Sequence, residues 1–146
     1  MSERQPVTAW PSVPEQTLSL LGGAAACVRE PGLPLRFRYQ AVRTLGRFYA
    51  ESDLSIMRRL GVNERTALRR KERGELSPDE SDRLARLARV TRVAIEAFGD
   101  EAKARRWLTS PNRALQQHTP LDLIASDAGA QAVTDELGRI EYGELY

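Results

Sequence analysis

The sequence predicts an all-α protein, and three observations support this fold class. Alanine, arginine, leucine and glutamate dominate the 146 residues, whereas aromatic residues make up only 6%. Apolar residues recur at helical spacing in several segments. These segments begin at capping residues such as Ser77 and end at glycines such as Gly99. A chain of this length forms one compact domain, or two small domains that share a core.

Residues 1–33 are predicted to form a flexible or weakly structured arm, because prolines and glycines interrupt the segment repeatedly. Residues 18–28 are uncharged and resemble the apolar part of a secretory signal, but the stretch is too short to span a membrane. Arg4 is the one cation before it, and Glu3 and Glu15 offset that charge. We therefore expect a cytoplasmic protein that does not bind a membrane.

Three helices are predicted in residues 34–76. Gly61 interrupts the apolar pattern, Asn63 is a suitable cap for the third helix, and Gly74 is a suitable terminator. The expected helices cover Leu35–Tyr49, Ser52 or Asp53 to about Arg59, and Glu64–Arg73.

Residues 77–146 are predicted to form four more helices and a tail. Ser77 and Glu80 make a capping box with Pro78 in the first turn, so the longest helix begins there. The expected helices run from Ser77 to Phe98, from Asp100 to Leu108, from Thr119 to Ala125, and from Asp127 to Gly138. The last eight residues form a segment that is too short for a further helix and is interrupted by Gly143, so we expect an extended C-terminal tail.

The sequence offers little for catalysis or metal binding. Cys27 is the single cysteine and His118 the single histidine, so neither a disulfide nor a Cys/His zinc site can form within one chain. The pair Gly22-Gly23 lacks the lysine of a phosphate-binding loop. We expect no catalytic residue, no metal and no cofactor, and hence a protein that is not an enzyme.

Charge is distributed unevenly along the chain. Residues 1–33 carry two arginines against three acids, a net charge of −1. Residues 34–74 carry eleven basic residues against four acids, a net of +7, and residues 75–146 carry nine against thirteen, a net of −4. A basic block between two acidic ones predicts that only the middle of the chain binds a polyanion.

The basic block also has the pattern of a helix-turn-helix, with two short helices joined at Gly61. Leu60, Val62 and Leu68 are expected to be buried between the helices. Arginine can bind a guanine edge and threonine a thymine methyl or a phosphate. A solvated arginine-rich face is the alternative, but the glycine turn and the regional charge favour DNA binding. The candidate DNA-binding residues are Asn63, Arg65, Thr66, Arg69, Arg70 and Arg73.

A series of motifs follows the basic block in a fixed order: Leu76–Leu84, Phe98–Asp100, Ala104–Leu108, Pro111–Leu115, Thr119–Ile124, Gly129-Ala130 and Leu137–Gly143. This series resembles the Xre/MbcA/ParS-type antitoxins that are partnered with RES-domain toxins. The resemblance covers about residues 35–146. It departs from the family at Gln116-Gln117, where a glycine is common, and residues 1–33 match nothing.

The resemblance implies an Xre-like helix-turn-helix over 34–76, a toxin-binding domain over 77–146, and dimerisation. It also implies that the partner is an NAD-degrading RES toxin, that this chain blocks the toxin's active site, and that the pair represses its own operon through operator DNA. The candidate toxin-binding residues are those of the tail: Arg139, Ile140, Glu141, Tyr142, Gly143, Glu144 and Tyr146.

The tail also suggests how a toxin would be blocked. Glu141, Glu144 and the carboxylate of Tyr146 place three negative charges near Tyr142. A pocket for the pyrophosphate of NAD presents cations, so an acidic tail with a tyrosine can enter it by electrostatic mimicry.

Three other functions fit parts of the sequence. A transcriptional regulator with a different partner or a small effector would share the helix-turn-helix. A RES-domain toxin gene beside this one would favour the antitoxin over such a regulator. An enzyme would need a convergent set of titratable groups. A structural adaptor would show no salt-dependent binding to the upstream DNA.

Overall fold

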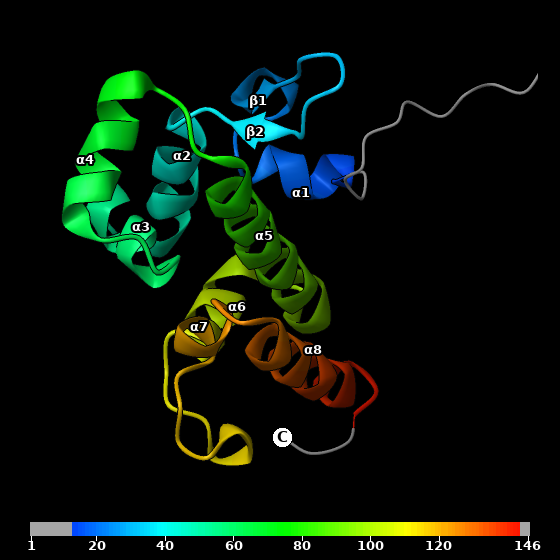
Figure 1. The fold of residues 1–146 in the computed structure, drawn as a ribbon. Helices are drawn as coiled ribbons and strands as arrows, with labels where there is room; N and C mark the ends of the chain where they lie inside the picture. Colours follow the sequence, from blue (N-terminus) through cyan, green and yellow to red (C-terminus); the bar gives the residue numbers. More distant parts are fainter. Residues whose placement is uncertain (1–12, 144–146) are drawn as a thin grey trace, which may run out of the picture.

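The computed structural model describes residues 13–143, and within that range the regular structure is helical apart from one two-stranded sheet (Figure 1). The expected all-α fold class is confirmed. The helices are α1 (Glu15–Ser19), α2 (Gln40–Tyr49), α3 (Asp53–Arg59), α4 (Glu64–Arg73), α5 (Pro78–Phe98), α6 (Glu101–Leu108), α7 (Pro120–Leu123) and α8 (Asp127–Glu141). Two 3₁₀ turns, η1 (Ala24–Ala26) and η2 (Arg113–Leu115), and the strands β1 (Cys27–Val28) and β2 (Arg36–Phe37) complete the described part.

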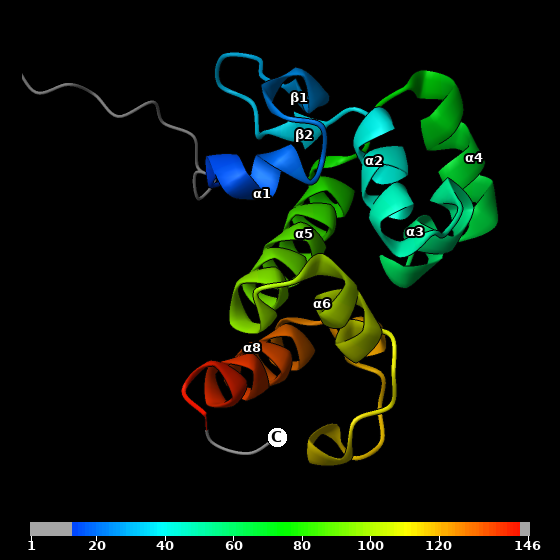
Figure 2. The same ribbon diagram turned by 180° about the vertical axis from the view of Figure 1, so that it is seen from behind.

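The long helix α5 lies at the centre of the molecule, where it packs against α1, β2, α6 and α8 (Figures 1 and 2). The predicted capping box begins it: Ser77 Oγ accepts from the Glu80 N–H at 3.2 Å, and Glu80 Oε1 accepts from the Ser77 N–H at 2.9 Å. Gly99 ends it with φ of 66°, in the left-handed region. Leu84 and Leu87 of α5 are buried in a single core that extends over both halves of the chain.

The structure differs from the prediction of a weakly structured arm in residues 13–33. Helix α1 packs on α5, and Leu18 and Leu21 are buried. Strand β1 pairs antiparallel with β2, with Cys27 opposite Phe37. The glycines that predicted irregularity instead form the turn after α1, where the φ of Gly22 is 104°. Residues 1–12 lie outside the described range.

Helices α2, α3 and α4 form the predicted helical trio. The caps are as expected: Ser52 Oγ accepts from the Ser55 N–H at 3.1 Å, and Asn63 Oδ1 accepts from the Thr66 N–H at 2.9 Å. The first helix begins five residues later than Leu35, at Gln40, because Arg36 and Phe37 pair with β1.

The C-terminal tail also differs from its prediction, because α8 continues past Gly138 to Glu141. Val133 and Leu137 are buried, and Ile140, one turn after Leu137, packs against the core. This apolar face favours continuation of the helix through the glycine. Arg139, Ile140 and Glu141 are therefore helical rather than extended.

The loop between η2 and α7 contains two glutamines in an unusual backbone conformation. Gln116 has φ of 56° and Gln117 has φ of 67°, both in the left-handed region. Glycine adopts this conformation without a steric cost, whereas other residues are strained there. Glycine at these two positions would therefore relieve backbone strain in the loop.

A test of the packing between α7 and α8 is the substitution Gly129→Ala. A Cβ built on Gly129 would lie 1.9 Å from the Leu123 carbonyl oxygen, so the two segments must separate. We expect the free energy of unfolding to fall by about 2–4 kcal/mol, measured by urea denaturation.

Gly138→Ala is the matched control, because a Cβ there meets nothing within 4 Å, in the last turn of the same helix. That variant should be as stable as the wild type or more stable by up to about 1 kcal/mol. Equal stabilities for the two variants would contradict the close approach of α7 to α8.

Candidate DNA-binding and partner-binding surfaces

The turn between α3 and α4 has the geometry of a helix-turn-helix. Leu60 and Val62 are buried, as predicted, and Gly61 between them has φ of 78°. Arg83 of α5 donates from Nη1 to the Leu60 carbonyl oxygen at 3.0 Å. The turn is therefore fixed both by its own apolar side chains and by the central helix.

The buried face of α4 is not the predicted one. Ala67 is 1% exposed and faces the core, whereas Leu68 is 48% exposed, so the prediction that Leu68 is buried was wrong. A small residue allows α4 to approach its neighbours closely. Arg65 and Arg69 are each two residues from Ala67 and therefore lie about 160° around the helix from it, on the outward face.

The structure separates the predicted DNA-binding residues into two groups. Arg65, Arg69 and Arg73 are exposed on α4, and Thr66 is half-buried at the edge of the same face. Asn63 is exposed, but its side chain caps α4. Arg70 is turned inward, since its Nε donates to Glu80 Oε1 at 2.7 Å and its side chain is only 20% exposed.

The Glu80 carboxylate holds α4 against α5 through an ion pair with Arg70. It binds both Arg70 and the Ser77 N–H, and its side chain is 9% exposed. Burial alone would raise the pKa of this carboxyl, but the hydrogen bonds from Arg70 and Ser77 outweigh it, and the pKa lies below its ordinary value of 4.5. Glu80 is therefore ionised at neutral pH.

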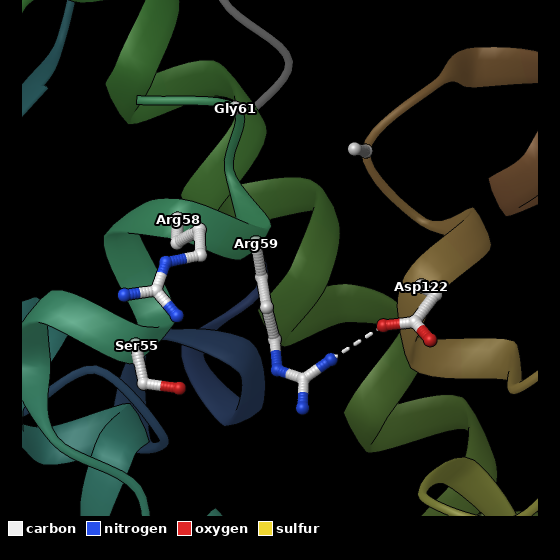
Figure 3. Close-up of a pocket in the computed structure, with 6 residues that line it drawn as sticks. Ser55, Arg58, Arg59, Gly61 and Asp122 are labelled. Carbon is white, nitrogen blue, oxygen red and sulfur yellow. Dashed lines mark hydrogen bonds and ion pairs between the residues drawn. The ribbon is translucent and has the colours of Figure 1, made fainter. Parts of the chain in front are cut away.

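An ion pair that the sequence analysis missed joins α3 to α7 (Figure 3). Arg59 Nη1 lies 2.6 Å from Asp122 Oδ1, and Arg59 Nε donates to Glu51 Oε2 at 2.9 Å. Hydrogen bonds from Arg59 hold the pKa of Glu51 below its ordinary range, against partial burial. No sequence signal distinguished Arg59, because its carboxylate partners are 8 and 63 positions away.

A shallow cleft of about 440 Å³ lies beside this ion pair. It is bounded by α3 on one side and by the α7 region on the other (Figure 3). The lining residues are Ser55, Arg58, Arg59, Gly61, Asp122 and Ala125. The guanidinium of Arg59 is already bound by two carboxylates, which leaves the exposed Arg58 as the cation that faces solvent here.

The C-terminal end of α8 carries the predicted partner-binding residues. Tyr142 is 83% exposed, and Glu141 and Gly143 are also exposed. Arg139 pairs with Glu136, and Ile140 packs against the core. Glu144 and Tyr146 lie outside the described residues. The structure thus brings Tyr142 and Glu141 to the surface and assigns Ile140 a structural contact.

Within residues 13–143, no group of acidic, histidine and cysteine side chains is arranged to hold a metal ion. No helix of that range has the length and apolarity needed to cross a bilayer. Figures 1 and 2 show α4 and α8 toward opposite ends of the molecule, with α5 between them.

Both halves of the chain match known families. Residues 28–89 match the antitoxin Xre-like helix-turn-helix domain, and residues 93–143 match the C-terminal toxin-binding domain of the Xre/MbcA/ParS antitoxins. Together the two matches cover most of residues 13–143, and both are domains of Xre-type antitoxins. Helix α5 is divided between the two matches, since residue 89 lies within its range of Pro78–Phe98.

The chain is also similar to three curated proteins, each named antitoxin Xre. It is 38% identical to that of Yersinia enterocolitica and 39% identical to that of Photorhabdus laumondii, over 90 residues in each case. Those matches cover 60% of this chain and 61% of each relative. It is 39% identical to that of Pseudomonas putida over 54% of this chain and 50% of the relative. The chain therefore spans about three fifths of the length of the first two relatives.

Glu80→Gln should destabilise the protein at neutral pH, because it weakens the cap of α5 and leaves Arg70 without its counter-ion. We expect a loss of about 1–3 kcal/mol at pH 7, measured by urea denaturation. Because the folded pKa of Glu80 is lowered, its contribution is present above pH 4.5 and disappears as the pH falls through the folded value. The difference between variant and wild type should therefore shrink in acid.

Glu72→Gln is the matched control, since Glu72 is exposed on α4. Its stability should stay within about 0.5 kcal/mol of the wild type. A Glu80→Gln deficit that is constant from pH 7 to pH 3 would contradict an ionised, paired Glu80.

Proposed function

We propose that this chain is the antitoxin of a toxin–antitoxin pair, a non-enzymatic cytoplasmic protein that acts as a homodimer. Its helix-turn-helix binds operator DNA and represses the operon. Its C-terminal domain neutralises an NAD-degrading RES-domain toxin by blocking the active site. The observation that carries the proposal is that Arg65 and Arg69 share the outward face of α4, in the basic part of the chain. The exposed Tyr142 directly follows α8, which lies toward the other end of the molecule (Figure 1).

The DNA-binding step rests on the exposed face of α4. A helix in the major groove contacts base edges through its outward side chains, and arginine pairs with guanine through two hydrogen bonds. Arg65 and Arg69 are one helical turn apart on that face. The exposed Arg58 on α3 is placed to contact a phosphate instead. Arg70 is not assigned to DNA, since it binds Glu80.

The toxin-binding step rests on the end of α8. Exposed aromatic residues often anchor protein interfaces. Tyr142 is 83% exposed, and Glu141 beside it is also exposed. Residues 75–146 carry nine basic residues against thirteen acidic ones, a net charge of −4. An exposed tyrosine beside the Glu141 carboxylate, in an acidic part of the chain, suits a cation-lined pocket that accepts NAD.

Arg65→Ala and Arg69→Ala should each weaken binding to the DNA upstream of the gene by about tenfold or more, because each removes a base or phosphate contact. Fluorescence anisotropy at several salt concentrations measures this. The slope of log K against log salt should also become shallower. Arg113→Ala is the control, since Arg113 is an exposed arginine of η2. Equal affinities for all three variants would overturn the assignment of α4.

Deletion of residues 142–146 should weaken toxin neutralisation while leaving DNA binding intact. The deletion removes Tyr142 but leaves α8 complete, because that helix ends at Glu141. Co-expression with the adjacent gene, followed by growth and cellular NAD, is the measurement. Growth and NAD should fall to the levels seen without antitoxin. Full protection by the truncated chain would rule out the blocking tail, and binding by the helical domain would then remain.

A second candidate is a transcriptional regulator that binds a small effector. The cleft beside Arg58 and Ser55 favours it, because a ligand there would touch both α3 and the α7 region. Co-purification with the product of the adjacent gene decides between the two functions.

A further inference from the structure

Leu68 is a large apolar side chain exposed on the helix that carries the outward arginines. It is 48% exposed and does not belong to the hydrophobic core. At about 100° per residue it lies one step around α4 from the buried Ala67, on the flank of the outward face. Arg65 precedes it by three residues and Arg69 follows it directly, and both are exposed. Leu68 is thus an apolar group bordered by cations.

The surroundings of Leu68 indicate a nucleic acid rather than a protein as the group that covers it. Residues 34–74 carry eleven basic residues against four acidic ones, a net charge of +7. Arg65, Arg69 and Arg73 are exposed on the same helix. The major groove offers one prominent apolar group beside its polar edges, the 5-methyl group of thymine.

We propose that Leu68 determines sequence specificity by contacting a thymine methyl group in the operator. This inference rests on the proposed DNA-binding function and deepens it. Leu68 and Arg65 are three residues apart, about 4.5 Å along the helix axis, which is close to the 3.4 Å between successive bases. The thymine therefore lies next to, or one base pair beyond, the guanine that an outward arginine binds.

The test uses the shortest upstream duplex that the full chain binds, or, if it binds none there, a duplex selected from a random-sequence pool. Each thymine is replaced in turn by deoxyuridine, which removes the 5-methyl group alone. With the wild-type chain, one replacement should lower affinity roughly three- to fivefold, the effect of one apolar methyl contact. With Leu68→Ala, the same replacement should change affinity by less than about 1.5-fold, because the partner of the methyl group is gone.

Leu33→Ala is the matched control, because Leu33 is 55% exposed and lies outside α4. It should keep the wild-type response to every deoxyuridine. If every replacement affects wild type and Leu68→Ala equally, the inference is overturned while the DNA-binding function stands. If neither chain binds any duplex specifically, both are overturned. If Leu68→Ala weakens binding to the toxin and leaves binding to DNA unchanged, the inference is also wrong.

Discussion

The Glu80 carboxylate determines which face of α4 is exposed to solvent, because it binds α4 and the start of α5 at once. It caps α5 through the Ser77 N–H and holds Arg70 of α4 at 2.7 Å. With Arg70 turned inward and Ala67 buried, Arg65 and Arg69 have only the outward face left. A charge pair that is largely shielded from solvent, as this one is, is costly to break, since either partner alone would be left uncompensated. The exposed face of α4 is thus a consequence of an interaction on its opposite side.

Helix α5 joins the N-terminal and C-terminal parts of the chain into one folding unit. Near its start, Ser81 Oγ accepts from the Phe37 N–H of β2 at 2.9 Å. Further along, the hydroxyl of Thr91 lies 2.6 Å from that of Tyr49 in α2. The same helix also packs against α6 and α8. The Arg59–Asp122 pair adds a direct link between α3 and α7. Opposite ends of the molecule can therefore serve different ligands while sharing one core.

The sequence predicted the features that depend on neighbouring residues. The caps at Ser52, Asn63 and Ser77 and the glycine after α4 act within one turn, so local pattern was sufficient. The features that it missed depend on distant contacts. The pairing of β1 with β2 shortens α2 and orders the segment after α1. The ion pair between Arg70 and Glu80 determines which face of α4 points inward. Because α4 packs closely on its neighbours, the small Ala67 is buried and Leu68 is exposed. Neither contact leaves a periodic signal.

Amide hydrogen exchange tests most directly the claim that two ends of one core bind two ligands. It is measured on the full chain alone, with the upstream DNA, and with the product of the adjacent gene. DNA should slow exchange in residues 60–73 and leave residues 127–143 unchanged, whereas the partner protein should slow exchange in the C-terminal part. Protection of α8 by DNA, or of the outward face of α4 by the partner protein, would contradict that claim.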